Sequence, residues 1–159
     1  MVVISMTMRK ILAALLACLG FSSTVISCGM YGSPSATYKT SGVVVSEADD
    51  SPIQGIRAVF GWKSRYVTDA YFKEIGNTRT NKTGKFSIEE KTYDLGRNNM
   101  FYVELTDVDG EKNGLYASKV VEMDFSKAQF KGGDGNWYEG KAEINLGTIK
   151  MTPETTPTE

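Results

Sequence analysis

Apolar residues recur at every second position along much of this chain. In residues 101–106, Phe101, Val103 and Leu105 alternate with more polar neighbours. Because successive side chains of a β-strand point to opposite faces, this spacing gives each strand one apolar face. After Cys28 there is no sustained apolar spacing of 3.6 residues, which a helix would need. The chain therefore predicts a fold made of short strands. Further alternating segments lie at 56–63, 121–125 and 141–146.

Turn-forming pairs separate these segments. Asp-Gly occurs at 109–110 and 134–135, and Asn-Gly at 113–114. These pairs favour tight hairpin turns between strands. We add a strand at 38–46 and another that opens after Gly84, and we expect one short helical turn over 69–75. The sum is an all-β fold, a single antiparallel Greek-key β-sandwich of about seven strands. Its expected core residues are Phe86, Phe101, Val103, Met123, Phe125, Ile144 and Leu146.

Composition excludes several kinds of chemistry. The chain has no histidine, which rules out His-based acid–base catalysis and His-containing zinc sites. Its two cysteines cannot form a four-thiolate metal site. With 18 basic and 19 acidic residues the net charge is −1, so no electrostatic signature favours nucleic acid as a partner. No nucleophile-elbow pattern and no phosphate-binding glycine loop occur, and we expect no enzyme activity.

The N-terminal residues have the parts of an export signal. Arg9 and Lys10 precede an apolar run over 11–21, and small polar residues follow it. A basic flank, a short apolar core and a small-residue cleavage site define a secretory signal. A membrane-spanning helix takes about 20 apolar residues, more than this run provides. We therefore expect residues 1–27 to be a signal peptide.

Residues 25–28 read Val-Ile-Ser-Cys, which resembles the bacterial lipobox. The resemblance implies that the thiol of Cys28 is lipidated and that the lipid bilayer is a partner of the chain. The alternative is an ordinary cleaved signal followed by an incidental cysteine. No acidic run follows Cys28, so we expect a lipid-anchored protein of the cell envelope, at the outer membrane and facing the periplasm. We expect a flexible tether over 28–37, the sandwich domain over 38–151 and a disordered tail over 152–159.

Oxygen-bearing side chains alternate in one predicted loop. Carboxylates and carboxamides at alternate loop positions are compatible with Ca²⁺, which binds six to eight oxygen atoms. The EF-hand pattern is absent, because the glycine comes at the fourth loop position and no glutamate stands at the twelfth. The alternative is a solvated loop in which these residues only form turns. Calcium is the one cofactor hypothesis the sequence offers. The residues are Asp107, Asp109, Glu111, Asn113 and Asp124.

Trp137 and Tyr138 stand in a glycine-rich segment. Two adjacent aromatic rings can form a platform for a ligand such as a carbohydrate. The alternative is a loop whose tryptophan folds back on the core. Both interpretations stay open at the level of sequence.

Three segments resemble carboxypeptidase regulatory-like domains, which are transthyretin-like or prealbumin-like sandwiches. These segments are Ser41-Gly-Val-Val-Val, Ser51-Pro-Ile-Gln-Gly-Ile-Arg-Ala-Val and Thr80-Asn-Lys-Thr-Gly-Lys-Phe-Ser-Ile. In this pattern Gly55 permits a tight turn into the second strand, and Phe86 fills the core after the turn at Gly84.

The whole chain after the signal is similar to the radical-SAM-associated putative lipoproteins of Bacteroidetes. Residues 28–34, Cys-Gly-Met-Tyr-Gly-Ser-Pro, resemble that family's start, with Gly29 as an additional residue. Residues 107–114, 121–126 and 135–140 also fit. The resemblance implies a neighbouring radical S-adenosylmethionine enzyme, with Tyr31 as the residue such an enzyme would modify. The alternative for Tyr31 is an aromatic ring at the membrane interface. We expect a non-catalytic binding or scaffold module, with a partner or substrate of that enzyme as the alternative.

Overall fold

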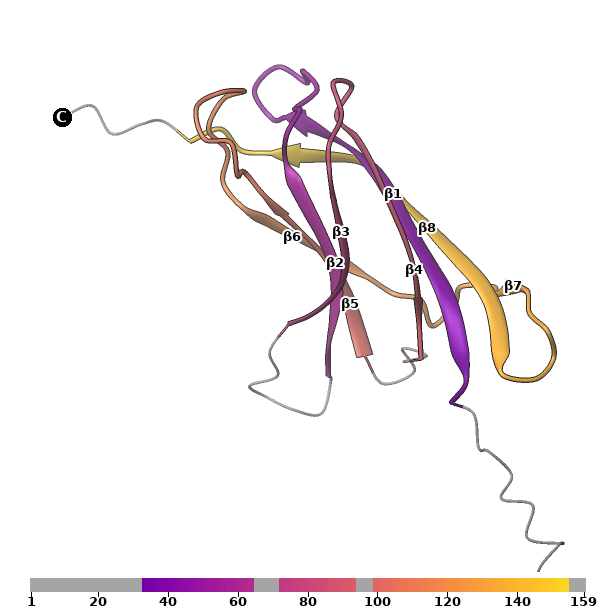
Figure 1. Ribbon diagram of the computed structural model, residues 1–159. Coiled ribbons are helices and arrows are strands. Elements are labelled where there is room, and N and C mark those ends of the chain that lie inside the picture. Colours follow the sequence, from indigo (N-terminus) through magenta and orange to yellow (C-terminus); the bar gives the residue numbers. More distant parts are fainter. Residues whose placement is uncertain (1–32, 65–71, 94–98, 155–159) are drawn as a thin grey trace, which may run out of the picture. The chain divides into compact units, whose positions relative to one another are not determined.

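The computed structural model describes residues 33–64, 72–93 and 99–154, and within these ranges it contains eight strands and no helix. The strands form two four-stranded sheets in the orders β4-β1-β8-β7 and β3-β2-β5-β6 (Figure 1). The two sheets pack face to face, which confirms the expected all-β sandwich. The strand bounds are β1 Ser35–Ser46, β2 Arg57–Ser64, β3 Lys73–Arg79, β4 Lys85–Thr92, β5 Asn99–Thr106, β6 Lys119–Met123, β7 Lys131–Gly132 and β8 Tyr138–Met151.

No helix in the described ranges is long and apolar enough to cross a membrane.

The first and last strands lie side by side and run in the same direction. β1 pairs with β8 in parallel register, whereas the other strand pairs are antiparallel. The first sheet is therefore mixed, which differs from the purely antiparallel arrangement that we expected. Parallel neighbours cannot be joined by a tight hairpin, so their pairing cannot be inferred from turn signals. Here the whole domain forms the connection between them.

Aromatic rings from both sheets form the centre of the core. Tyr38 of β1 stacks on Phe101 of β5 with their ring centroids 4.9 Å apart. Phe60 lies 5.6 Å and Phe125 5.1 Å from Phe101, measured between centroids. Such offset and edge-to-face pairs add to the stabilisation that burial itself gives. The predicted core is confirmed at Phe86, Phe101, Val103, Met123 and Phe125, all of which are buried.

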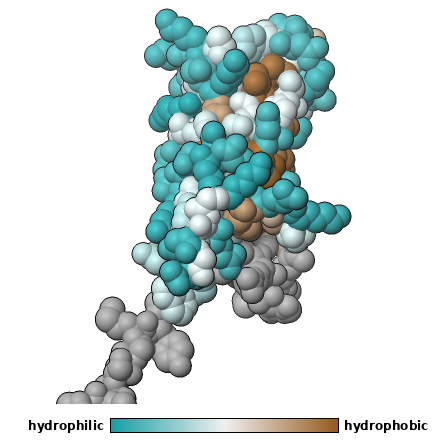
Figure 2. Space-filling model, turned by 90° about the vertical axis from the view of Figure 1, so that its right-hand side faces the viewer, coloured by the Kyte–Doolittle hydropathy of each residue, from teal (hydrophilic) through white to brown (hydrophobic). Residues whose placement is uncertain are grey.

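Ile144 and Leu146 are only half-buried, although we expected them in the core. Both lie on β8 beyond the two residue pairs that join it to β7. Among the described residues no strand pairs with that edge of β8 beyond Lys141, and Ile144 and Leu146 pack against the core and still reach solvent. Apolar surface is visible among hydrophilic side chains on the side of the molecule that carries β7 and β8 (Figure 2).

Two strands were absent from the expectation. We expected a short helical turn over 69–75. Of this range the structure describes Phe72, which lies outside any strand, and the residues from Lys73 onward, which belong to strand β3. Alternation in β3 is hidden because Gly76 lies where an inward side chain would stand, with Glu90 of β4 packed over it. β7 is two residues long and has no room for a repeating pattern.

The domain is longer at both ends than the range 38–151. β1 begins at Ser35, whose amide donates to the carbonyl oxygen of Trp137 at 2.7 Å. Residues 35–37 therefore belong to a strand and not to the tether. At the other end, Glu154 donates to the carbonyl of Leu115 at 2.8 Å, and Pro153 bridges to Tyr116. Residues 152–154 are thus part of the fold, and 155–159 lie outside the described residues.

Candidate functional site

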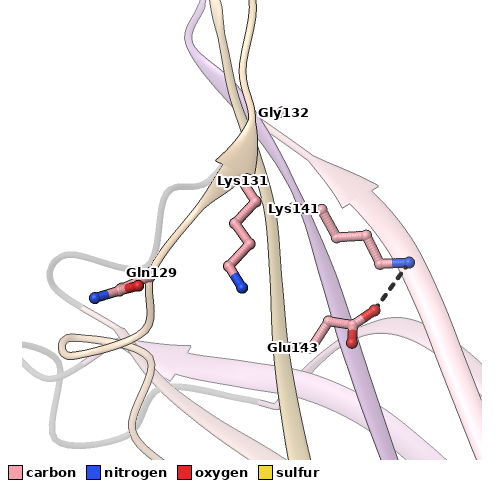
Figure 3. Close-up of a pocket in the computed structure, with 5 residues that line it drawn as sticks. All are labelled: Gln129, Lys131, Gly132, Lys141 and Glu143. Atoms are coloured by element: carbon pink, nitrogen blue, oxygen red, sulfur yellow. Dashed lines mark ion pairs between the residues drawn. The ribbon is translucent and has the colours of Figure 1, made fainter.

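A groove of about 560 Å³ lies on the sheet β4-β1-β8-β7, beside the hairpin that joins β7 to β8 (Figure 3). Lys131 and Lys141 occupy directly opposed positions on these two strands, so their side chains share one face. Like charges placed opposite each other destabilise a strand pair unless a counter-charge lies nearby. The groove must therefore contain carboxylates as well. Its lining residues are Gln129, Lys131, Gly132, Lys141 and Glu143.

Ion pairs across three strands supply those carboxylates. Lys141 Nζ on β8 lies 2.7 Å from Glu89 Oε2 on β4 and 3.1 Å from Glu143 Oε1. Lys39 on β1, between these strands, lies 3.3 Å from the same Glu143 oxygen. The hydrogen bond that Lys141 donates to Glu89, and then the one that it donates to Glu143, raise the pKa of Lys141. The hydrogen bonds from Lys141 and then Lys39 lower the pKa of Glu143.

These pKa shifts bear on what the groove can do chemically. A general acid or base works best when its pKa lies near the working pH. The pKa of Lys141 is raised and the pKa of Glu143 is lowered, so both values move away from neutral pH. Both groups therefore stay charged at neutral pH, which suits electrostatic recognition better than proton transfer.

Lys131 is the charged group of the groove that no carboxylate holds. None of the ion pairs or hydrogen bonds among the described residues involves its amine. Its side chain extends into the space between Gln129 and β8 (Figure 3). A free ammonium beside a carboxamide offers donors to an anionic group such as a carboxylate or a phosphate.

The hairpin that borders the groove is held by one carboxylate. Asp134 Oδ1 accepts the backbone amides of Asn136 at 2.8 Å and Tyr138 at 3.0 Å. These two bonds, in that order, lower the pKa of Asp134. Gly140 has a φ of +111°, and a Cβ there would lie 2.5 Å from the carbonyl oxygen of Lys131. The hairpin therefore has a defined conformation, set by Asp134 and by a glycine where no side chain fits.

The two predicted aromatic residues lie differently. The hydroxyl of Tyr138 is 2.9 Å from Thr37 Oγ1, and the ammonium of Lys91 stands 4.9 Å from the centroid of its ring. Trp137 is 48% exposed. A second hollow of about 430 Å³ at the hairpin includes Tyr138 in its lining, but not Trp137. Tyr138 is thus part of the sheet surface, and Trp137 is the residue that presents a large aromatic surface to solvent.

The five calcium candidates act in turns. Asp107 accepts the backbone amides of Asp109 and Tyr116, and Asp124 accepts the amide of Ser126 at 2.8 Å. The carboxamide of Asn113 donates to Asp109. In the part of the chain that the structure describes, no three His, Cys, Asp or Glu side chains form a group that could hold a metal ion. The hydrogen bonds of Asp107, Asp109, Asn113 and Asp124 fit the turn-forming alternative, and calcium binding at these residues and Glu111 stays a prediction.

The residues of the carboxypeptidase regulatory-like pattern meet at the end of the sandwich opposite Trp137. Thr80 Oγ1 donates to the carbonyl of Ile53 at 2.7 Å and accepts the amide of Ile56 at 3.0 Å. Gly84 has a φ of +70°, and a Cβ there would collide with the carbonyl oxygen of Val44. These residues position the backbone, and none of them lines either of the two hollows at the β7–β8 hairpin. We call this end of the sandwich the turn end. Its residues are Asp49, Ile53, Gly55, Thr80, Gly84, Asp107, Val108 and Asp109.

Cys28 and Tyr31 lie outside the described residues. Lipidation of Cys28 and modification of Tyr31 therefore stay predictions.

Sequence inspection missed the groove. Glu89 and Glu90 are adjacent in the sequence, but the side chains of neighbouring residues in a strand face opposite ways. Glu89 binds Lys141, and Glu90 packs over Gly76. Lys141 and Glu143 occupy the polar positions of an alternating strand. That signal places them on the outer face, yet it does not say which strands lie beside them.

Comparison with known proteins leaves the family open. No family model matches the chain, and no curated protein matches it. Among solved structures, the chain is similar to a 9R-lipoxygenase from Cyanothece PCC8801, with 16% identity and a TM-score of 0.42, over 77% of this chain and 17% of that one. The chain thus spans about a sixth of that enzyme.

Two further structures show likeness of the same order. For the C-terminal domain of the shaft pilin SpaA from Lactobacillus rhamnosus GG, identity is 10% and the TM-score 0.39, over 74% of this chain and 98% of that one. For 3-chlorocatechol 1,2-dioxygenase from Rhodococcus opacus 1CP, identity is 10% and the TM-score 0.43, over 79% and 62% of the two chains. Likeness at this level carries no argument about activity, ligand or partner.

Proposed function

We propose that this chain is a lipid-anchored lipoprotein of the cell envelope that acts as a non-catalytic binding or scaffold module. The groove at β7 and β8 is its binding site, and an acidic group of a partner is its ligand. The observation that carries the proposal is the arrangement of charge in the groove. Lys141 is neutralised by two carboxylates, whereas Lys131 extends into the groove without one.

The framework around the groove supports binding. Its lining comes from β8, from β7 and from the segment leading into β7, and the hairpin is fixed by Asp134. A site on paired strands is presented with little conformational entropy left to lose, which favours association. The ladder from Lys39 to Glu143, Lys141 and Glu89 keeps the neighbouring charges in place.

The sequence before the domain supports anchoring. Residues 25–28 resemble a lipobox, and the first strand begins at Ser35, seven residues after Cys28. The lipid chains of a modified cysteine bind a bilayer through about 0.8 kcal/mol per buried methylene. The finer family assignment, to carboxypeptidase regulatory-like domains and radical-SAM-associated lipoproteins, rests on the quoted motifs. The alternative function, partner or substrate of a radical S-adenosylmethionine enzyme with Tyr31 as its target, rests on the same resemblance.

One experiment tests anchoring and binding together. The full chain, Cys28→Ser and Lys131→Glu are expressed in a Gram-negative host, and cell fractions are treated with a lysine-reactive crosslinker. We expect wild type and Lys131→Glu in the membrane fraction and Cys28→Ser in the soluble periplasm. We expect the crosslinked envelope partners of wild type to be lost in Lys131→Glu.

Lys85→Glu is the matched control, because Lys85 is an exposed lysine on β4 of the same sheet and lies outside the groove. It should keep the crosslinked partners. If Cys28→Ser fractionates like wild type, the anchor is wrong. If Lys131→Glu and Lys85→Glu behave alike, the groove is not the binding site.

A further inference from the structure

We propose that the end of the sandwich at which the described chain begins rests on the bilayer surface, with Trp137 and Tyr93 in the headgroup region. This inference rests on the proposed lipid anchor and adds an orientation to it. We call Ser35, Lys91, Tyr93, Trp137 and Tyr138 the N-proximal end. The occupant of this surface is a lipid headgroup layer.

Three neighbouring strands bring these residues together. Ser35 opens β1 and pairs with Tyr138, the first residue of β8. On the other side of β1, Ala36 pairs with Thr92, the last residue of β4, and Tyr93 follows directly. Tyr93 and Trp137 thus flank the start of β1 in the order β4-β1-β8 (Figure 1). The amide of Ser35 donates to Trp137 at 2.7 Å, which ties the hairpin to the incoming chain.

The covalent chain sets how far this end can lie from a lipidated cysteine. Cys28 precedes Ser35 by seven residues. An extended chain spans at most about 3.6 Å per residue, so Ser35 lies within about 25 Å of Cys28. The turn end lies at the opposite end of the 12-residue strand β1. A short tether to the lipid therefore favours the N-proximal end as the end that faces the membrane.

Exposed aromatic rings fit the chemistry of that layer. Tyr93 is 70% and Trp137 48% exposed, and they are two of the four large apolar side chains exposed in the described ranges. Tryptophan and tyrosine favour the membrane–water interface, because one part of each ring system is apolar and another can donate a hydrogen bond. Both other exposed residues, Val108 and Val120, lack a polar part.

Charge contributes little to this contact. The hairpin and its surroundings contain two lysines, Lys91 and Lys131, and two carboxylates, Asp134 and Glu139, so their summed charge is about zero although Lys131 itself is in no ion pair among the described residues. A polybasic surface would prefer anionic lipid, since each lysine near such a surface adds about 1 kcal/mol. Trp137 and Tyr93 should therefore contact neutral and anionic bilayers equally well. Comparing the two lipid mixtures distinguishes contact through the aromatic rings from attraction by charge.

The test uses the fluorescence of Trp137 in the lipid-anchored full chain. The protein carries Trp62→Phe, so Trp137 is its one tryptophan. It is reconstituted in vesicles of phosphatidylcholine, with or without phosphatidylglycerol, and with or without lipids brominated near the headgroup. We expect the brominated lipid to quench the fluorescence of Trp137. We also expect the iodide quenching constant to fall to about half, or below half, of its value in the soluble Cys28→Ser form. Both effects should be equal in the two lipid mixtures.

The control places a tryptophan at the turn end. Val108→Trp in a Trp62→Phe, Trp137→Phe background should show no lipid quenching and unchanged access to iodide. If Trp62→Phe fails to fold, the difference between wild type and Trp137→Phe gives the same quantity.

The outcomes separate the two proposals. A full chain that does not float with vesicles overturns the anchor, and this inference with it. A chain that floats while Trp137 remains as accessible to iodide as in Cys28→Ser overturns only the inference. Quenching that appears only with phosphatidylglycerol also overturns it, because charge and not the aromatic rings would then hold this end.

Discussion

The two ends of this sandwich use their distinctive residues in opposite ways. At the turn end, the side chains of Thr80 and Asp107 form hydrogen bonds with backbone groups of the chain itself. At the N-proximal end, Tyr93 and Trp137 expose most or half of their surface. A motif that is readable in the sequence thus marks the end that holds the fold together. The N-proximal end carries the glycine-rich aromatic segment 135–140, which presents the side chain of Trp137 to solvent.

The difference between the two ends arises because buried backbone amides and carbonyls need hydrogen-bond partners. The turn end folds the segment 51–56 against the loop after β5, so its buried amides and carbonyls need partners. Thr80 supplies two of them with one hydroxyl. In the described residues of the N-proximal end, Asp134 closes the hairpin, and none of the hydrogen bonds of that hairpin uses the side chain of Trp137. Replacing residues at the two ends should therefore affect different quantities.

The largest effect on stability should come from Phe86 on β4, and Tyr93, directly after the end of that strand, serves as the comparison. Phe86, near the start of β4 and 5% exposed, packs under the turn end; Tyr93 follows the last residue of β4. We expect Phe86→Ala to lower the free energy of unfolding by about 3–5 kcal/mol, because it leaves a cavity. Tyr93→Ala should change it by less than about 0.5 kcal/mol, as for other exposed sites. Urea denaturation followed by circular dichroism measures both, and equal losses would contradict the contrast between the ends.

A smaller effect should follow from removing one hydroxyl at the turn end. Thr80→Val keeps the shape of the side chain but leaves the carbonyl of Ile53 and the amide of Ile56 without their partner. A buried unsatisfied polar group costs about 1–3 kcal/mol. Thr148→Val, on the exposed part of β8, is the matched control and should be nearly neutral. The same denaturation assay compares them; a Thr80→Val protein as stable as the control would remove this role of Thr80.

The smallest effect should be a local response of the hairpin to acid. The folded-state pKa of Asp134 is lowered by the amides of Asn136 and Tyr138, below the value of about 3.9 for an unperturbed aspartate. Its stabilisation is therefore complete above that value and is lost as the pH falls through the folded pKa. Hydrogen exchange at the Tyr138 amide, corrected for its intrinsic rate, should show less protection below about pH 4.

Two variants test the origin of that acid response. Asp134→Asn keeps an acceptor oxygen but cannot titrate, so the response should disappear. Asp49→Asn removes a carboxylate of the turn end whose pKa is lowered mainly by the Ser51 hydroxyl. In that variant the protection of the Tyr138 amide from exchange should still fall with acid. Loss of the response in Asp49→Asn would mean that the response does not arise from Asp134 alone.

Much of the fold could be predicted because alternation reports directly which face of a strand is buried. The strands that contain Phe101, Val103 and Met123, and the buried state of these side chains, follow from the spacing of apolar residues. β3 could not be found in this way, because Gly76 removes an inward side chain. The half-exposure of Ile144 depends on β7 being only two residues long. That length is decided by tertiary structure.

The groove could not be predicted because its charges meet only through strand pairing. Lys39, Glu89 and Lys141 lie 50 or more residues apart in the chain, on three strands. Their contact requires β1 to lie between β4 and β8, and one of those pairings is parallel. Local turn chemistry carries no information on such a pairing. Turn chemistry is also ambiguous at Asp107 and Asp109, where carboxylates that take part in turns have the spacing of a calcium loop.

The parallel pairing of β1 and β8 has a mechanical consequence. The chain enters β1 at Ser35 and leaves β8 at Met151, and the two points are at opposite ends of a pair of strands that run side by side. A pull between an N-terminal anchor and a load on the C-terminus would slide β1 against β8 lengthwise, so the hydrogen bonds between them would bear the tension together. A hairpin loaded at its open end yields one bond after another. Resistance to such a force is governed by the unfolding rate and not by equilibrium stability, and this strand order would let the domain hold under tension.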